Sequence, residues 1–238
     1  MRTSPSQVYL RYHPDVAHTA FSFALALGAI LVALAELTAY EFPLTPRAVT
    51  EALTLAQSGR GEARAAFHRP YRITVGRAPV DYIEIVTPFR RVELAAEVRV
   101  GAGERLLSQR EALAIAGQAG DVLELHTELT FHPLNTFVGV PSYDVTLVPL
   151  PGANPPIEAR DLQRVPRFGM RVEGTPLPFP FPFPSAPPVG PGSQPLTGGT
   201  VIATFDGTLL ERTRAYDVVV GEKGSTLTRV RVDLAGLR

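Results

Sequence analysis

The clearest alternation of apolar and polar positions along the chain runs from Val122 to Phe131. Side chains of an extended chain alternate between two faces, so the odd and even positions of this segment point in opposite directions. The apolar set is Leu123, Leu125, Leu129 and Phe131. The polar set is Glu124, His126, Glu128 and Thr130. The segment therefore predicts a strand with one buried face and one face in water.

Shorter stretches rich in β-branched and aromatic residues predict further strands. They are 71–75, 80–86, 92–100, 142–150, 157–165, 168–172, 200–205, 207–213, 216–221 and 226–234. Turn signals separate several of them, at Asp206-Gly207 and at Gly221–Gly224. We expect 142–150 to lie antiparallel to 122–131, across the loop between them.

Two segments carry helix signals instead. In the first, Thr45 is a suitable N-cap, Pro46 occupies the first helical position and Gly59 can end the helix. Its apolar stripe is Ala48, Val49, Ala52, Leu53 and Ala56. The second begins with a Ser108–Glu111 capping box, and we expect it to end at Gly117.

Many short strands, few helices and no regular βαβ rhythm predict a mainly β fold. We expect an antiparallel β-sandwich with an N-terminal signal or anchor helix and one or two short additional helices. Residues 36–66 would form a helical segment. The sandwich would span 67–238, as one body or as two lobes, 67–150 and 157–238.

An uninterrupted apolar run, Ala20–Ala35, stands near the N-terminus. Arg2 and Arg11 precede it and acidic residues follow it, which orients the rest of the chain outward. Small residues at Ala33 and Ala35 permit cleavage before Glu36. We therefore predict that 1–35 is a signal peptide and that the protein is exported, to the periplasm or beyond. An uncleaved signal anchor and a buried helix of a cytosolic domain are the alternatives.

The run Pro176–Pro188 alternates proline with large apolar residues. In an extended chain Phe179, Phe181 and Phe183 would share one face, and the prolines would lack donors along one edge. We therefore predict that 174–195 is an edge strap, with its rings on the core and its prolines preventing further strand pairing. A Pro-x-x-Pro ligand and a disordered linker are the alternatives.

Composition excludes several classes of protein. The 238 residues contain no cysteine, which rules out disulfides, thiolate metal sites and cysteine nucleophiles. The formal net charge of zero and the scattered arginines argue against nucleic-acid binding. The sequence lacks the common nucleotide, calcium and hydrolase motifs, so we expect no cofactor.

Two groups of residues are candidate sites. Glu124, His126 and Glu128 share a strand face and could bind a metal ion together with His132. A solvated polar face is the alternative. The loop His132–Ser142 is longer than a hairpin needs, which is typical of binding loops. The polar groups for binding in and beside this loop are His132, Asn135, Thr136 and Tyr143. The alternative is a loop held by its own apolar packing.

These patterns favour an exported, non-catalytic β-sandwich that acts as a binding or structural module at or outside the cell envelope. Its partner would be an envelope protein or a small ligand, with membrane contact only through an uncleaved N-terminal segment. A secreted hydrolase on the Glu124/His126/Glu128 face, with or without a metal ion, is one alternative. A membrane-anchored partner-binding protein is another.

Overall fold

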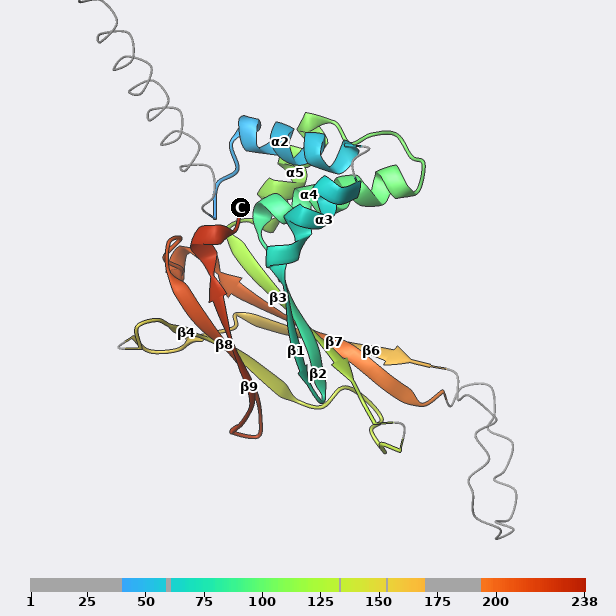
Figure 1. The fold of residues 1–238 in the computed structure, drawn as a ribbon, viewed down its shortest axis with the longest axis vertical. Helices are drawn as coiled ribbons and strands as arrows, with labels where there is room; N and C mark the ends of the chain where they lie inside the picture. The colour runs from blue at the N-terminus through green and yellow to red at the C-terminus, as the bar shows by residue number, and fades with distance from the viewer. Residues whose placement is uncertain (1–39, 59–60, 133, 153, 170–193) are drawn as a thin grey trace, which may run out of the picture. The chain divides into compact units, whose positions relative to one another are not determined.

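A computed structural model describes residues 40–58, 61–132, 134–152, 154–169 and 194–238 (Figure 1). The chain divides into Met1–Thr38 and Ala39–Arg238, and all described residues belong to the second unit. The predicted signal segment and the phenylalanine–proline run Pro176–Pro188 lie outside the described residues. Among the helices that the structure describes, none has the length and apolar character of a membrane span.

The fold is mainly β and contains two antiparallel sheets. The first has the strand order β1-β2-β3-β7-β6 and the second β5-β4-β8-β9. The first sheet comprises β1 (Arg72–Arg77), β2 (Val80–Val86), β3 (Val122–Thr130), β7 (Leu196–Asp206) and β6 (Asp161–Phe168). The second comprises β5 (Ile157–Glu158), β4 (Tyr143–Pro149), β8 (Ala215–Glu222) and β9 (Ser225–Asp233).

One apolar core takes side chains from both sheets. Leu123, Leu125 and Leu129 of β3 are buried in the same cluster as Leu147 of β4 and Val218 of β8. The alternation that predicted β3 is therefore confirmed, with its apolar face inward and its polar face outward. The turn predicted at Gly221–Gly224 also forms, with Gly224 at a positive φ of 81° between β8 and β9.

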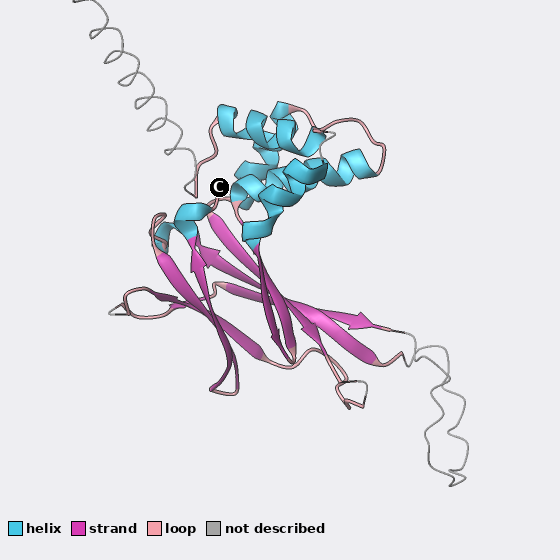
Figure 2. Cartoon of the chain, in the orientation of Figure 1, coloured by secondary structure: helices cyan, strands magenta, loops and turns pink. Residues whose placement is uncertain are grey.

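A group of helices lies at one end of the strands (Figure 2). It comprises α2 (Pro46–Gln57), α3 (Gly61–His68), α4 (Pro88–Gly101) and α5 (Gln109–Ala119). Short 3-10 helices follow α3, β7 and β9, namely η1 (Arg69–Tyr71), η2 (Gly207–Leu209) and η3 (Leu234–Gly236). The helices bury a second apolar cluster, and Phe67 packs against both clusters. The described part of the chain thus has more helix than the one or two short helices expected.

Helix α2 confirms its predicted start and buried face. The Thr45 side chain accepts a hydrogen bond from the Ala48 backbone N–H, and Pro46 is the first helical residue. The buried residues are the five predicted ones, Ala48, Val49, Ala52, Leu53 and Ala56. The helix ends at Gln57 with Ser58 as its C-cap, before the predicted Gly59.

The strand predicted over 92–100 was wrong, because these residues belong to helix α4. Thr87 caps the helix by accepting a hydrogen bond from the Arg90 N–H, and Pro88 occupies the first turn. Phe89, Val92 and Ala96 are buried at a helical spacing. The β-branched valines favoured a strand, but the cap and the burial of this face override that weak preference.

Three further expectations were also wrong. Strand β4 does not pair with β3; it pairs with β5 and β8, because the loop after β3 carries the chain into the other sheet. Residues 207–213 form η2 and a turn instead of a strand. Helix α5 passes through Gly117 and ends at Gly120, where φ is 68° and only glycine is comfortable.

Candidate functional site

The outer face of the first sheet brings Glu124 and His126 together. The His126 Nε2 atom lies 3.2 Å from Oε2 of Glu124, and a guanidinium nitrogen of Arg91 lies 3.0 Å from Oε1. The His126 hydrogen bond and the Arg91 charge hold the pKa of the Glu124 carboxyl below its ordinary value, although partial burial opposes them. Glu124 is therefore an ion-paired carboxylate on a partly exposed face.

The other two predicted metal ligands are held elsewhere. Glu128 pairs with Arg167 of β6 and accepts a 2.7 Å hydrogen bond from the Thr200 hydroxyl of β7. The Nδ1 atom of His132 accepts a 3.2 Å hydrogen bond from the Leu134 N–H. Within the described part of the chain, no three of these four side chains converge in this conformation. Their role as metal ligands stays a prediction.

The base of the 132–142 loop is fixed by Asn135. Its side-chain Nδ2 donates to the carbonyls of His132 and Leu196, at 2.8 and 2.9 Å, and its Oδ1 accepts from the Phe137 N–H at 3.0 Å. The Phe137 ring packs edge-on against Phe131, with ring centres 5.1 Å apart. Local hydrogen bonds and aromatic packing therefore hold this loop.

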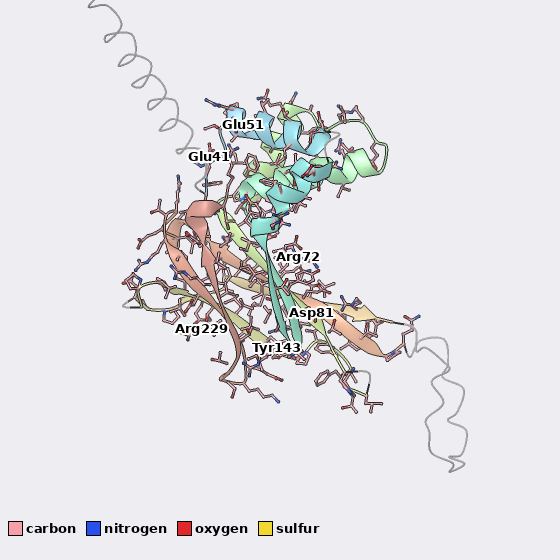
Figure 3. All side chains as sticks on the ribbon, in the orientation of Figure 1. Glu41, Glu51, Arg72, Asp81, Tyr143 and Arg229 are labelled. Atoms are coloured by element: carbon pink, nitrogen blue, oxygen red, sulfur yellow. The ribbon has the colours of Figure 1, made fainter. Side chains whose placement is uncertain are left out.

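The tip of the loop exposes apolar side chains. Leu134 is 81% and Val138 98% exposed, and about half of Phe137 is accessible. Thr136 and His132 also face solvent. Tyr143, labelled in Figure 3, instead belongs to the core, and its burial raises the pKa of its hydroxyl. Of the four predicted binding residues, His132 and Thr136 are thus exposed to solvent, Asn135 supports the loop and Tyr143 is buried.

A third cluster was not anticipated from the sequence. His68 of α3 lies beside Glu93 and Glu97 of α4. Each of these residues offers one potential ligand atom, and the three atoms all lie within 4.8 Å of one another. Two carboxylates four residues apart on one element lie close together in a helix, whereas in a strand they would be roughly 13 Å apart. The interpretation of 92–100 as a strand concealed that spacing, and the Thr87-Pro88 cap is the signal that would have revealed it.

No family model, curated protein or solved structure matches this chain.

Proposed function

We propose that this protein is an exported, non-catalytic β-sandwich that serves as a binding module at or outside the cell envelope. In this proposal the two sheets are the layers of the sandwich, which is supported by their shared apolar core. The loop 132–142 is the binding surface. Its occupant is an apolar patch on another envelope protein.

The exposed apolar side chains of the loop tip are the observation that carries the proposal. Leu134 and Val138 leave apolar surface in water, and holding such side chains in place costs conformational entropy. A partner that covers them would remove this surface from water and so gain hydrophobic free energy. Residues 132–142 contain no Asp, Glu, Lys or Arg, which favours an uncharged protein surface over an acidic lipid or a nucleic acid. Because the loop is held at its base, binding needs little further ordering.

Cross-linking in the native host tests this surface. A photo-reactive amino acid at Val138 is expected to give one discrete adduct, which the double variant with Leu134→Ser should abolish. The same probe at Val98 of α4, which is 71% exposed, is the matched control. No adduct from Val138, or an identical pattern from Val98, would contradict the proposed binding surface.

Export is tested separately by fractionation and by N-terminal sequencing of the protein from its host. A periplasmic or extracellular chain that begins at Glu36 is the expected result. The first residue of the described core is Tyr40, whose hydroxyl donates a 2.7 Å hydrogen bond to Asp121, so this cleavage would leave that contact in place. A membrane-bound chain that retains residues 20–35 would favour the anchored alternative, and a cytosolic chain would overturn export.

The hydrolase alternative uses the Glu124/His126/Glu128 face and remains a second proposal. The contact between Glu124 and His126 supports it, because a carboxylate orients a histidine for metal binding or proton transfer. Metal content and melting temperature of His126→Ala and Glu128→Gln test it. Wild-type levels of both in these variants would remove this alternative.

A further inference from the structure

The helical layer holds a histidine and two glutamates in contact. His68 is the last residue of α3, while Glu93 and Glu97 lie one turn apart on α4. The Nε2 atom of His68 is 3.3 Å from Oε1 of Glu93 and 3.2 Å from Oε2 of Glu97. The group lies at the end of β2 from which α4 departs, away from the 132–142 loop that follows the opposite end of the antiparallel β3.

Glu93 is buried without a hydrogen-bonding partner. Its side chain is 0% exposed, and neither carboxylate oxygen has a hydrogen bond. Both ring nitrogens of His68 are equally buried and unpartnered. A buried carboxylate without partners is costly when it is charged, so the ionised form of Glu93 needs a partner at this position.

The neighbouring arginines do not supply that partner. Two nitrogens of the Arg90 guanidinium donate to Glu84 and to the Ile85 carbonyl, and its Nε atom has no hydrogen bond to either glutamate of the cluster. The Arg64 Nε atom lies 3.6 Å from Oε1 of Glu97, which leaves Oε2 of that residue directed at His68. The cluster thus brings two carboxylates and an imidazole together, and the partner that fits them is a cation.

The distances match those of a coordination sphere. In a tetrahedral zinc site with bonds of about 2.0–2.2 Å, neighbouring ligand atoms lie roughly 3.3–3.6 Å apart. The two contacts of His68, 3.2 and 3.3 Å, lie at the short end of this separation. A dication would also balance the two carboxylate charges. Imidazole nitrogen with carboxylate oxygen is a donor set for first-row divalent ions.

We propose that His68, Glu93 and Glu97 bind a divalent transition-metal ion, for which Zn²⁺ is the best fit. The ion joins the end of α3 to the middle of α4 and so stabilises the helical layer. Three protein ligands leave a fourth position for water. The partly exposed side chains of His68 and Glu97, 24% and 25% accessible, give water and the ion a route to the site.

Metal binding must also displace a proton. Burial, reinforced by the negative charge of Glu97, raises the pKa of the Glu93 carboxyl to about 8 in the metal-free chain. Its charged and titratable neighbours are His68 and Arg64 from α3, and Arg90 and Glu97 from α4. Carboxylate and imidazole ligands bind a metal ion in their deprotonated forms, so any proton that these residues carry is released on binding.

Calorimetric titration of the full chain, stripped with chelator and then dialysed, tests the site with Zn²⁺ and with Mn²⁺. One equivalent of Zn²⁺ should bind and raise the melting temperature. Loss of a residue that hydrogen-bonds to a metal ligand typically weakens metal binding roughly 10–100-fold. Glu93→Gln and His68→Gln remove a ligand itself, so they should weaken Zn²⁺ binding by more than this. Glu93→Gln keeps the shape of the side chain, and its melting temperature in chelator shows that it folds.

The matched control is Glu62→Gln, which makes the same change at an exposed glutamate of α3. It should bind Zn²⁺ as the wild type does. His126→Gln and Glu128→Gln are a separate test of the sheet face. Absence of stoichiometric binding to the folded wild type, or undiminished binding in folded Glu93→Gln and His68→Gln, would overturn the proposal. Loss of binding only in the His126 and Glu128 variants would also overturn it, and would place the ion on β3.

Discussion

At the scale of single residues, Glu93 is a carboxyl group buried in the helical layer without a hydrogen bond. The metal-free chain reduces the cost of this burial by keeping the carboxyl protonated, because burial and the nearby Glu97 disfavour its charged form. A protonated acid folds at a smaller penalty than an ion, so the stability of the chain without metal depends on how readily Glu93 keeps its proton.

This dependence sets the direction of a pH effect. The ordinary pKa of Glu93 is 4.5 and the folded value is about 8, so between these values the folded chain binds more protons than the unfolded chain. Stability then falls as the pH rises through this window. In chelator, melting temperatures from pH 5 to pH 9 should therefore decline more steeply for the wild type than for Glu93→Gln. Parallel curves would show that Glu93 ionises normally.

Gly207 occupies a position where no side chain fits. A Cβ atom there would lie 2.0 Å from Oδ1 of Asp121 and 2.6 Å from the Tyr40 hydroxyl, which are themselves hydrogen-bonded. Gly207→Ala must displace this pair, and overpacking of this kind costs about 1–3 kcal/mol. Gly236→Ala is the control, since it lies in a similar 3-10 helix with nothing within 4 Å of the added atom. Equal denaturant midpoints for the two variants would contradict the crowding.

At the scale of elements, local signals predicted some parts well and misled in others. The alternation in β3 and the cap and stripe of α2 were confirmed, because in both a single buried face matches the period of the element. Helix α4 was missed because its valines suit either a strand or a buried helix face. The Thr87-Pro88 cap and the contacts of Phe89 and Val92 with the other helices together favour the helix.

The candidate sites likewise divide into contacts that local sequence patterns predict and contacts that depend on tertiary packing. Glu124 and His126 lie on the same face of one strand, and their side chains are in contact, as the alternation predicted. The cluster of His68 with Glu93 and Glu97 depends on the packing of α3 against α4, over a sequence separation that no local pattern spans. The exposure of Leu134 and Val138 likewise depends on where β4 goes after the loop.

The capping box of α5 offers a test at this scale. The Ser108 hydroxyl contacts the Glu111 carboxylate, which also accepts a 2.9 Å hydrogen bond from the Ser108 N–H. These hydrogen bonds lower the pKa of the Glu111 carboxyl to about 2. Ser108→Ala removes the N-cap side chain that accepts from the Glu111 N–H, and loss of such a cap should destabilise the protein by about 1 kcal/mol at pH 7. The exposed Arg110→Ala serves as the control, and a loss equal to that of the control would argue against the cap.

At the scale of the whole molecule, contacts near Tyr71 connect the helical layer to the sheets. Phe67 packs on Tyr71 and on Phe89, with ring centres 5.0 and 5.7 Å apart. The Tyr71 hydroxyl accepts a 2.8 Å hydrogen bond from the Arg238 N–H, and the Arg238 side chain pairs with Glu51 of α2. The helical layer and the sheets therefore share direct contacts through Phe67, Tyr71 and Arg238.

The shared core between the sheets makes a prediction about cooperativity. Leu125 of β3 and Leu147 of β4 are both buried in it, at 0% and 1% exposure, although their strands belong to different sheets. Truncating either to alanine should cost about 2–5 kcal/mol and shift one common unfolding transition. Far-ultraviolet circular dichroism and tyrosine fluorescence should report the same midpoint in each variant, and the exposed Leu134→Ala should stay within about 0.5 kcal/mol of the wild type. If Leu125→Ala and Leu147→Ala instead separated the unfolding into two transitions, each moved by one variant alone, the sheets would be independent lobes and their common core would not determine stability.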